Sequence, residues 1–274
     1  MLLAQVSDLH LRPVGIAADR VVETNMLAER AFRAIARMRP AVDALILSGD
    51  LTETGLTLEY EVLVTLLARY VRCPVLAIPG NHDQRQNFRA SLAHLPGVIE
   101  DAEFVQYAFD LDPVRLVMLD TVAADAAHGE LCARRQEWLE QTLAQAPRKP
   151  TIVVMHHPPF DCGIAHMDRI KLERAEEFAA IMACHPQVER ILCGHVHRPA
   201  TTRVGHAIAS IAPSIAHQVA LDLDPEGPSA FVMEPAAFQL HHVAPGGAIV
   251  SHIAYVEDFP GPFPFLAASD NPDV

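Results

Sequence analysis

The chain has 274 residues, 50% hydrophobic and 20% charged, a composition typical of a folded globular protein of one or two domains. This balance excludes a disordered chain and a membrane-embedded one. Its 34 acidic and 21 basic residues give a formal charge of −13, and the sequence has no Lys/Arg run, which argues against a long nucleic acid as substrate.

Short apolar runs alternate along the chain with stretches of helical period. The runs, with the polar residues that end them, cover 2–10, 44–50, 74–83, 115–121, 151–159 and 190–197. Helices are expected at 25–39, where Met26, Leu27, Phe32, Ile35 and Met38 share a broad face, at 84–91 and at 134–146. This alternation predicts a layered α/β fold.

The sequence becomes proline-rich and irregular after about residue 220. We therefore expect a main domain over 1–220 and a small appended region over 221–274, partly strand. The segment 259–270, "FPGPFPFLAASD", is apolar and cannot continue a helix, so it must pack on its own domain or on a neighbour. We expect a homo-oligomer, at least a dimer.

Cysteine usage indicates the cellular compartment. The five cysteines are an odd number without CxxC spacing, which indicates neither a disulfide framework nor a zinc ribbon and favours a reducing compartment. The first apolar run begins directly after Met1, without a basic leader. We expect a cytoplasmic protein without membrane contact.

Polar residues follow the C-terminal ends of the apolar runs. They are Asp8, His10, Asp50, Asn81, His82, His156, His195 and His197. In open α/β sheets the carboxyl ends of strands share one edge, where ligands bind. These side chains are therefore expected to lie close together.

Their chemistry suits a metal centre. Carboxylate, imidazole and amide ligands fit zinc, manganese or iron, and the absence of thiolates argues against a closed structural zinc site. Seven such ligands, the eight residues without His82, are too many for one ion. Two ions about 3.5–4 Å apart, bridged by one carboxylate, would use them all in the arrangement suited to in-line displacement at phosphorus.

The motifs D-x-H at 8–10, G-D at 49–50, G-N-H-D at 80–83, His156 and G-H-x-H at 194–197 occur in this order. This set resembles the signature of the calcineurin-like metallophosphoesterases. The resemblance implies a four-layer α/β/β/α sandwich of two mixed sheets flanked by helices. It also implies two divalent ions, with manganese, iron, zinc and cobalt all open.

The resemblance assigns the ligands residue by residue. The first ion would take Asp8, His10 and His197, the second Asn81, His156 and His195, and Asp50 would bridge both. A two-residue step in extended chain is expected to aim His195 and His197 to the same side of the strand end.

The remaining site residues also follow from the resemblance. His82 would protonate the leaving-group oxygen, with Asp83 either orienting its imidazole or capping the next helix. Asn81, His82 and His217 would contact substrate, since His217 resembles a substrate-side histidine of bacterial cyclic nucleotide and glycerophosphodiester phosphodiesterases. His157 is expected to be structural, because the family motif uses only the first of the paired histidines.

The expected function is hydrolysis of small phosphodiesters, either glycerophosphodiesters or 3′,5′-cyclic nucleotides, by attack of a metal-bridging hydroxide at phosphorus. One alternative is a phosphomonoesterase or broad nuclease of the same superfamily. Another is a non-catalytic metal-binding scaffold, although such a scaffold has no need of His82 or of a complete ligand set.

Overall fold

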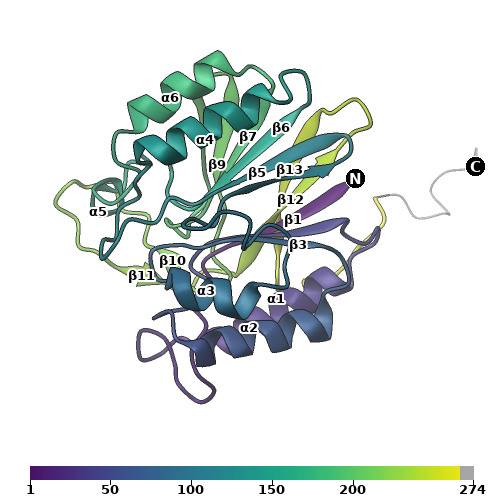
Figure 1. The fold of residues 1–274 in the computed structure, drawn as a ribbon. Helices are drawn as coiled ribbons and strands as arrows, with labels where there is room; N and C mark the ends of the chain where they lie inside the picture. Colours follow the sequence, from purple (N-terminus) through teal and green to yellow (C-terminus); the bar gives the residue numbers. More distant parts are fainter. Residues whose placement is uncertain (266–274) are drawn as a thin grey trace, which may run out of the picture.

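The computed structural model describes residues 1–265 and contains two mixed sheets packed face to face (Figure 1). The five-stranded sheet has the order β13-β12-β1-β2-β3, with β1 Leu2–Val6, β2 Ala44–Ser48, β3 Val75–Ile78, β12 Ala237–Val243 and β13 Ile249–Tyr255. The six-stranded sheet has the order β4-β5-β6-β7-β9-β8, with β4 Tyr107–Leu111, β5 Val114–Leu119, β6 Thr151–Met155, β7 Val188–Cys193, β9 Ala207–Ile211 and β8 Ala200–Val204. A separate short hairpin joins β10 Gln218–Val219 and β11 Phe231–Val232.

Helices cover the outer face of each sheet. The five-stranded sheet is covered by α1 Thr24–Ala36, α2 Thr57–Tyr70 and α3 Arg85–Leu92, and the six-stranded sheet by α4 Ala133–Ala144 and α6 Ala175–Cys184 (Figure 1). The short α5 Ala165–Asp168 lies in the connection between β6 and α6. The predicted four-layer α/β/β/α sandwich is confirmed.

The three helices expected from the sequence are present, but α1 ends at Ala36, so Met38 lies beyond the helix and not on its face. Met26 is 52% exposed and does not join the buried face of α1, which is formed by residues such as Leu27 and Phe32. The side chain of Gln84, not Asp83, caps α3 by accepting a hydrogen bond from the Asn87 amide.

The inner strands are apolar throughout because both of their faces are covered. Every residue of β2 is buried, and β2 pairs in parallel with β1 on one side and β3 on the other. The second sheet repeats this arrangement with β5, β6, β7 and β9 in parallel. The carboxyl ends of the parallel strands of both sheets lie at one end of the sandwich.

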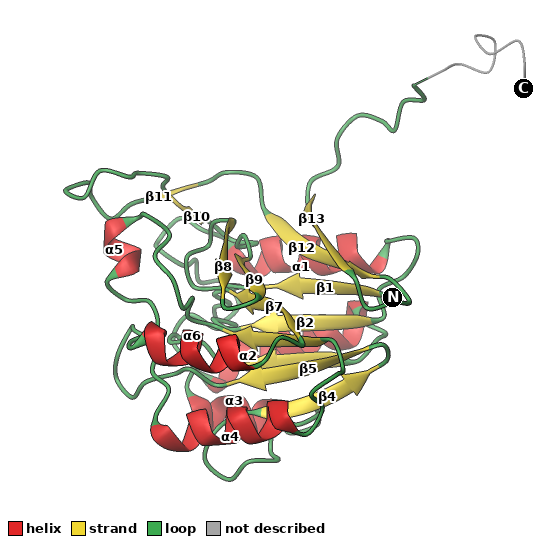
Figure 2. Cartoon of the chain, turned by 90° about the horizontal axis from the view of Figure 1, so that it is seen from above, coloured by secondary structure: helices red, strands yellow, loops and turns green. Residues whose placement is uncertain are grey.

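The C-terminal part of the chain enters the five-stranded sheet. β12 pairs antiparallel with β1, and β13 pairs antiparallel with β12. The segment after β13 runs away from the body (Figure 2). Its side chains Phe259, Phe263 and Phe265 are exposed. Residues 266–274 of the expected appended region lie outside the described residues, and the division at residue 220 stays a prediction. None of the helices within residues 1–265 has the length and apolar character needed to span a membrane.

Candidate metal centre

The polar residues after the strands converge on one site, through backbone turns that few residues adopt. Asp8, His10, Asp50, His195 and His197 all have positive φ, between 48° and 72°. The expected extended step at His195 and His197 is therefore wrong: each histidine sits in a left-handed turn. Such turns carry strain, which the surrounding fold must hold in place.

Four of the residues form one buried group on the side of β1. Nε2 of His10 lies 3.0 Å from Nε2 of His197 and 3.8 Å from Oδ2 of Asp50. Nε2 of His197 also lies 3.5 Å from Oδ1 of Asp8. These ligand atoms are close enough together to bind one ion.

A second group lies on the other side of Asp50. Nε2 of His156 is 3.2 Å from Oδ2 of Asp50 and 3.2 Å from Oδ1 of Asn81. The rings of His156 and His195 lie 5.2 Å apart, centroid to centroid. Asp50 thus contacts both groups through the same oxygen, Oδ2.

The residues present fit divalent cations. Oδ2 of Asp8 and Nε2 of His195 are buried without a hydrogen-bond partner, although buried polar atoms are normally paired. The His10 and His197 nitrogens also face each other, and at least one must lack a proton for that contact. Cations bound in the two groups would satisfy these lone pairs.

Hydrogen bonds on the far side of each ring turn Nε2 toward the centre. Nδ1 of His156 donates to the Ser48 carbonyl at 2.9 Å, and Nδ1 of His197 donates to the His217 carbonyl at 2.9 Å. Nδ1 of His10 lies 2.7 Å from Oε2 of Glu53. Such partners fix the tautomer and orientation of ligating histidines.

The charges are mutually dependent. Burial opposes protonation of His10 and His156, but Glu53 and Asp50 raise the pKa of His10 to about 9, and Asp50 raises that of His156 to about 9. Burial would raise the pKa of Asp50, but His156 and other nearby imidazoles hold it well below its usual range. Burial lowers the pKa of His195 to about 3. Cations binding here would therefore displace protons from His10 and His156.

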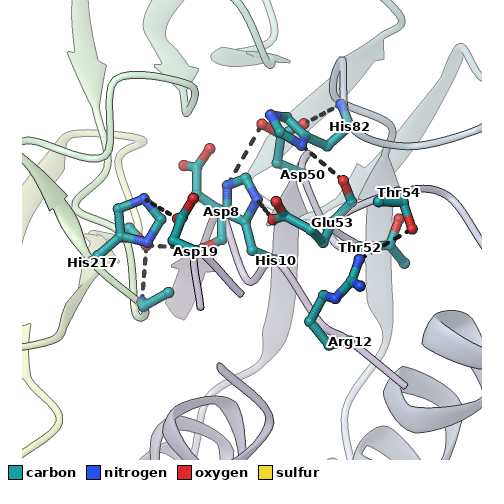
Figure 3. Close-up of polar contacts among 12 residues, drawn as sticks. Asp8, His10, Arg12, Asp19, Asp50, Thr52, Glu53, Thr54, His82 and His217 are labelled. Carbon is teal, nitrogen blue, oxygen red and sulfur yellow. Dashed lines mark hydrogen bonds and ion pairs between the residues drawn. The ribbon is translucent and has the colours of Figure 1, made fainter. Parts of the chain in front are cut away.

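His82 borders the two groups. Its backbone N–H donates to Oδ1 of Asp50 at 2.9 Å, and its Nδ1 donates to the carbonyl of Glu53 at 2.9 Å (Figure 3). The Nδ1–H bond to a carbonyl leaves Nε2 as the nitrogen available for chemistry.

Asp83 does not orient His82, which corrects the expected role. Its carboxylate accepts from the amides of Leu51, Thr52 and Gly80 and from the hydroxyls of Thr52 and Tyr60. Burial and the nearby Asp50 raise the pKa of Asp83, although the hydrogen bonds from Gly80, Leu51 and Thr52 act to lower it. Asp83 instead joins the loops after β2 and β3, which carry Asp50 and Asn81.

Two cavities meet at the centre. The larger, about 890 Å³, extends between α3 and residues 122–127, and the smaller, about 250 Å³, lies over the histidines. They share Glu53, Asn81, His82 and Ala127. His217 lines the smaller one, where its Nε2 lies 3.7 Å from Oδ2 of Asp19 (Figure 3).

Glu53 lies at the site although no role was expected for it, whereas His157 lies where its sequence neighbours suggested. Glu53 follows Asp50 by three residues, and this spacing after a strand end was the available signal. His157 is fully buried, with its ring 4.7 Å from that of His195 and its Nδ1 2.8 Å from Thr121 Oγ1. Its packing supports the expected structural role.

Known proteins are similar to this chain in sequence and in fold. Residues 1–199 match the family model described as calcineurin-like phosphoesterase. A probable glycerophosphodiester phosphodiesterase GpdQ of Arcobacter nitrofigilis is 34% identical over 275 residues, covering 97% of each chain. The 3′,5′-cyclic adenosine monophosphate phosphodiesterase CpdA of Escherichia coli is 29% identical over 198 residues, covering 72% of this chain and 69% of CpdA. A dimetal phosphatase from Danio rerio shares the fold, with a TM-score of 0.63 at 16% identity, covering 88% of this chain and 92% of that one.

Proposed function

The chain belongs to the calcineurin-like phosphoesterase family, and from that premise we propose that it is a metal-dependent hydrolase of small phosphodiesters. The observation that carries the proposal is Asp50, whose Oδ2 contacts both ligand groups beside two cavities.

The chain's metal ligands follow from the two groups. We propose that Asp8, His10 and His197 hold one divalent ion, that Asn81, His156 and His195 hold a second, and that Asp50 contacts both. When bound, the ions would neutralise charge on the phosphoryl oxygens and lower the pKa of water. Manganese, iron, zinc and cobalt all suit this nitrogen and oxygen set.

His82 would supply the proton that the leaving oxygen needs. Nδ1 of His82 keeps its proton because it donates to the Glu53 carbonyl. Nε2 therefore carries a proton only when the ring is an imidazolium with both nitrogens protonated, and that form is the acid. Asn81 and His82 border both cavities, so each is placed to contact a diester. His217, which lines the smaller cavity, would also contact the substrate.

The two cavities support a diester substrate. A diester carries two alcohol groups on one phosphorus, and one centre with two adjoining cavities gives each group a place. Within the described residues, no Phe, Tyr or Trp lines the larger cavity, which is bordered by side chains such as Thr54, Gln84 and Gln86. Among the described residues this cavity offers a nucleobase no Phe, Tyr or Trp ring to stack on, which favours a small hydroxylated alcohol such as glycerol.

A substrate panel on the Mn²⁺-loaded protein tests the proposal. Glycerophosphoethanolamine is expected to be cleaved faster than 3′,5′-cyclic AMP, and both faster than glycerol phosphate. A preference for the monoester would favour a phosphomonoesterase. Failure to cleave any substrate, with metal bound, would favour a non-catalytic scaffold.

We further propose a cytoplasmic homo-oligomer in which the appended region 221–274 contributes to association. The exposed Phe259, Phe263 and Phe265 support association, since a free chain would leave them in water. The five unpaired cysteines support a reducing compartment. A monomeric mass by light scattering at micromolar concentration would contradict the oligomer.

A further inference from the structure

Glu53 contacts two functional histidines through different parts of the residue. Its side-chain Oε2 lies 2.7 Å from Nδ1 of His10, and its main-chain carbonyl accepts from Nδ1 of His82 at 2.9 Å (Figure 3). The two imidazole rings lie 4.7 Å apart, edge to face. Glu53 also borders both cavities.

The loop that carries Glu53 is held rigidly by a buried acid. Glu59 is fully buried and accepts from the backbone N–H groups of Thr54 and Leu56 and from the Thr54 hydroxyl. Arg12 balances its charge, with Nη1 3.1 Å from Oε1 of Glu59. The Glu53 amide donates to the Leu11 carbonyl at 3.1 Å, which ties this loop to the segment that carries His10.

The two contacts have different chemical effects. A carboxylate on Nδ1–H makes Nε2 of His10 a stronger donor to a cation and fixes the ring's orientation. A carbonyl on Nδ1–H of His82 fixes its ring and tautomer without adding charge. The side chain of Glu53 therefore acts on the metal ligand, and its backbone acts on the acid.

We propose that Glu53 is a positioning residue that sets the metal affinity of the His10 group through its carboxylate and the orientation of His82 through its carbonyl. The second half rests on the proposed function, because it concerns the proton given to a leaving group. The first half concerns cation binding alone.

Substitution of Glu53 separates the two halves, since every variant keeps the backbone carbonyl. Glu53→Gln keeps the shape of the side chain and removes its charge, and Glu53→Ala removes the contact altogether. Glu173→Gln is the matched control, because Glu173 lies 3.4 Å from Nε2 of His128, a histidine that belongs to neither ligand group. Thermal melts establish that each variant is folded.

The decisive measurement is titration of the metal-free protein with Mn²⁺. In Glu53→Gln and Glu53→Ala, one of the two binding steps is expected to weaken about 10- to 100-fold, with the other step and the Glu173→Gln control unchanged. Two unchanged steps, or two steps weakened alike, would overturn the assignment, since Glu53 touches only one ligand. This readout stands even if the wild-type protein cleaves no diester.

The second measurement compares rates at saturating Mn²⁺ on an alkyl diester and on a bis-nitrophenyl diester. The ratio of the two rates is expected to match wild type in Glu53→Gln, because the carbonyl still holds His82. A selective loss on the alkyl diester would show that the side chain orients the acid, and would overturn the assignment of that role to the backbone. If wild type cleaves neither diester, the proposed function fails and the Mn²⁺ titration still decides the role of the carboxylate.

Discussion

Replacing Asp83 with alanine removes the acceptor that holds together the loops after β2 and β3. The change leaves the buried amides of Leu51, Thr52 and Gly80 without their partner. An unsatisfied buried donor costs about 1–3 kcal/mol, so the three together are expected to cost about 3–9 kcal/mol. This is a large part of the roughly 5–15 kcal/mol by which a domain is stable.

Asp83→Asn should cost less, for a geometric reason. Oδ2 accepts two backbone amides, from Leu51 and Gly80, whereas Oδ1 accepts one amide and two hydroxyls, from Thr52 and Tyr60. Hydroxyls can rotate to accept from the new NH₂, but amides cannot. The asparagine nitrogen should take the Oδ1 position and leave one amide unpaired, which costs about 1–3 kcal/mol.

Urea unfolding of the metal-free variants at neutral pH measures these losses, and Tyr60→Phe serves as a control that removes a single hydroxyl. The expected order of stability is wild type, Tyr60→Phe, Asp83→Asn, Asp83→Ala. Wild-type stability of Asp83→Ala, with a rate loss confined to poor leaving groups, would refute this reasoning. That result would mean that Asp83 acts on His82 after all.

Three further changes test other parts of the structure. His82→Ala should lose about 10²–10⁴-fold on alkyl diesters and clearly less on a bis-nitrophenyl diester, because only the alkoxide needs a proton; equal losses with both metals bound would contradict the acid role. Gly80→Ala should bind less metal by elemental analysis, because its Cβ would lie 2.2 Å from Oδ1 of Asp50 and 2.7 Å from Nε2 of His156; a full metal complement would count against this site. Burial lowers the pKa of His241 to about 3, below the ordinary value of about 6.5, so the folded state stays neutral while the unfolded state gains a proton. The stability that this histidine contributes is present above about pH 6.5 and is lost as pH falls toward 3, by up to about 1.4 kcal/mol per pH unit. The His241→Gln variant should therefore lose less stability in acid than wild type. Equal losses of stability in the two proteins between pH 7 and pH 5, measured by urea unfolding, would contradict the shift.

Local patterns predicted the inner strands, three of the helices and the residues that gather at the site. The apolar run that became β2 was readable because a strand covered on both faces is apolar throughout, and Asp50 stood at its end. Asp8 and His156 were readable as candidate ligands for the same reason, since each follows a buried strand. Such patterns indicate where a strand ends and which polar side chains follow it.

Contacts made in three dimensions were not readable. The place of β12 beside β1 depends on pairing between residues such as Leu3 and His241, and neither run indicates its partner. The role of Asp83 depends on hydrogen-bond donors from separate parts of the chain, such as Leu51 and Tyr60. Its position directly after His82 therefore suggested a contact with that histidine which the structure does not have. The left-handed turn at His195 contradicts the extended chain that β7 suggested, because turn geometry is set by the loops packed around it.

The pairing of β1 with β12 also has a consequence for synthesis on the ribosome. β1 carries the segment leading to Asp8 and His10, but its second neighbour is the stretch 237–243, and the N-terminal ammonium of Met1 bonds to the Val243 carbonyl at 3.0 Å. A nascent chain that has emerged only to residue 220 holds β1 as an open edge, which invites pairing with other chains. The strand β1, which is synthesised first, therefore gains its second neighbour only after β12, the next to last strand, has been synthesised.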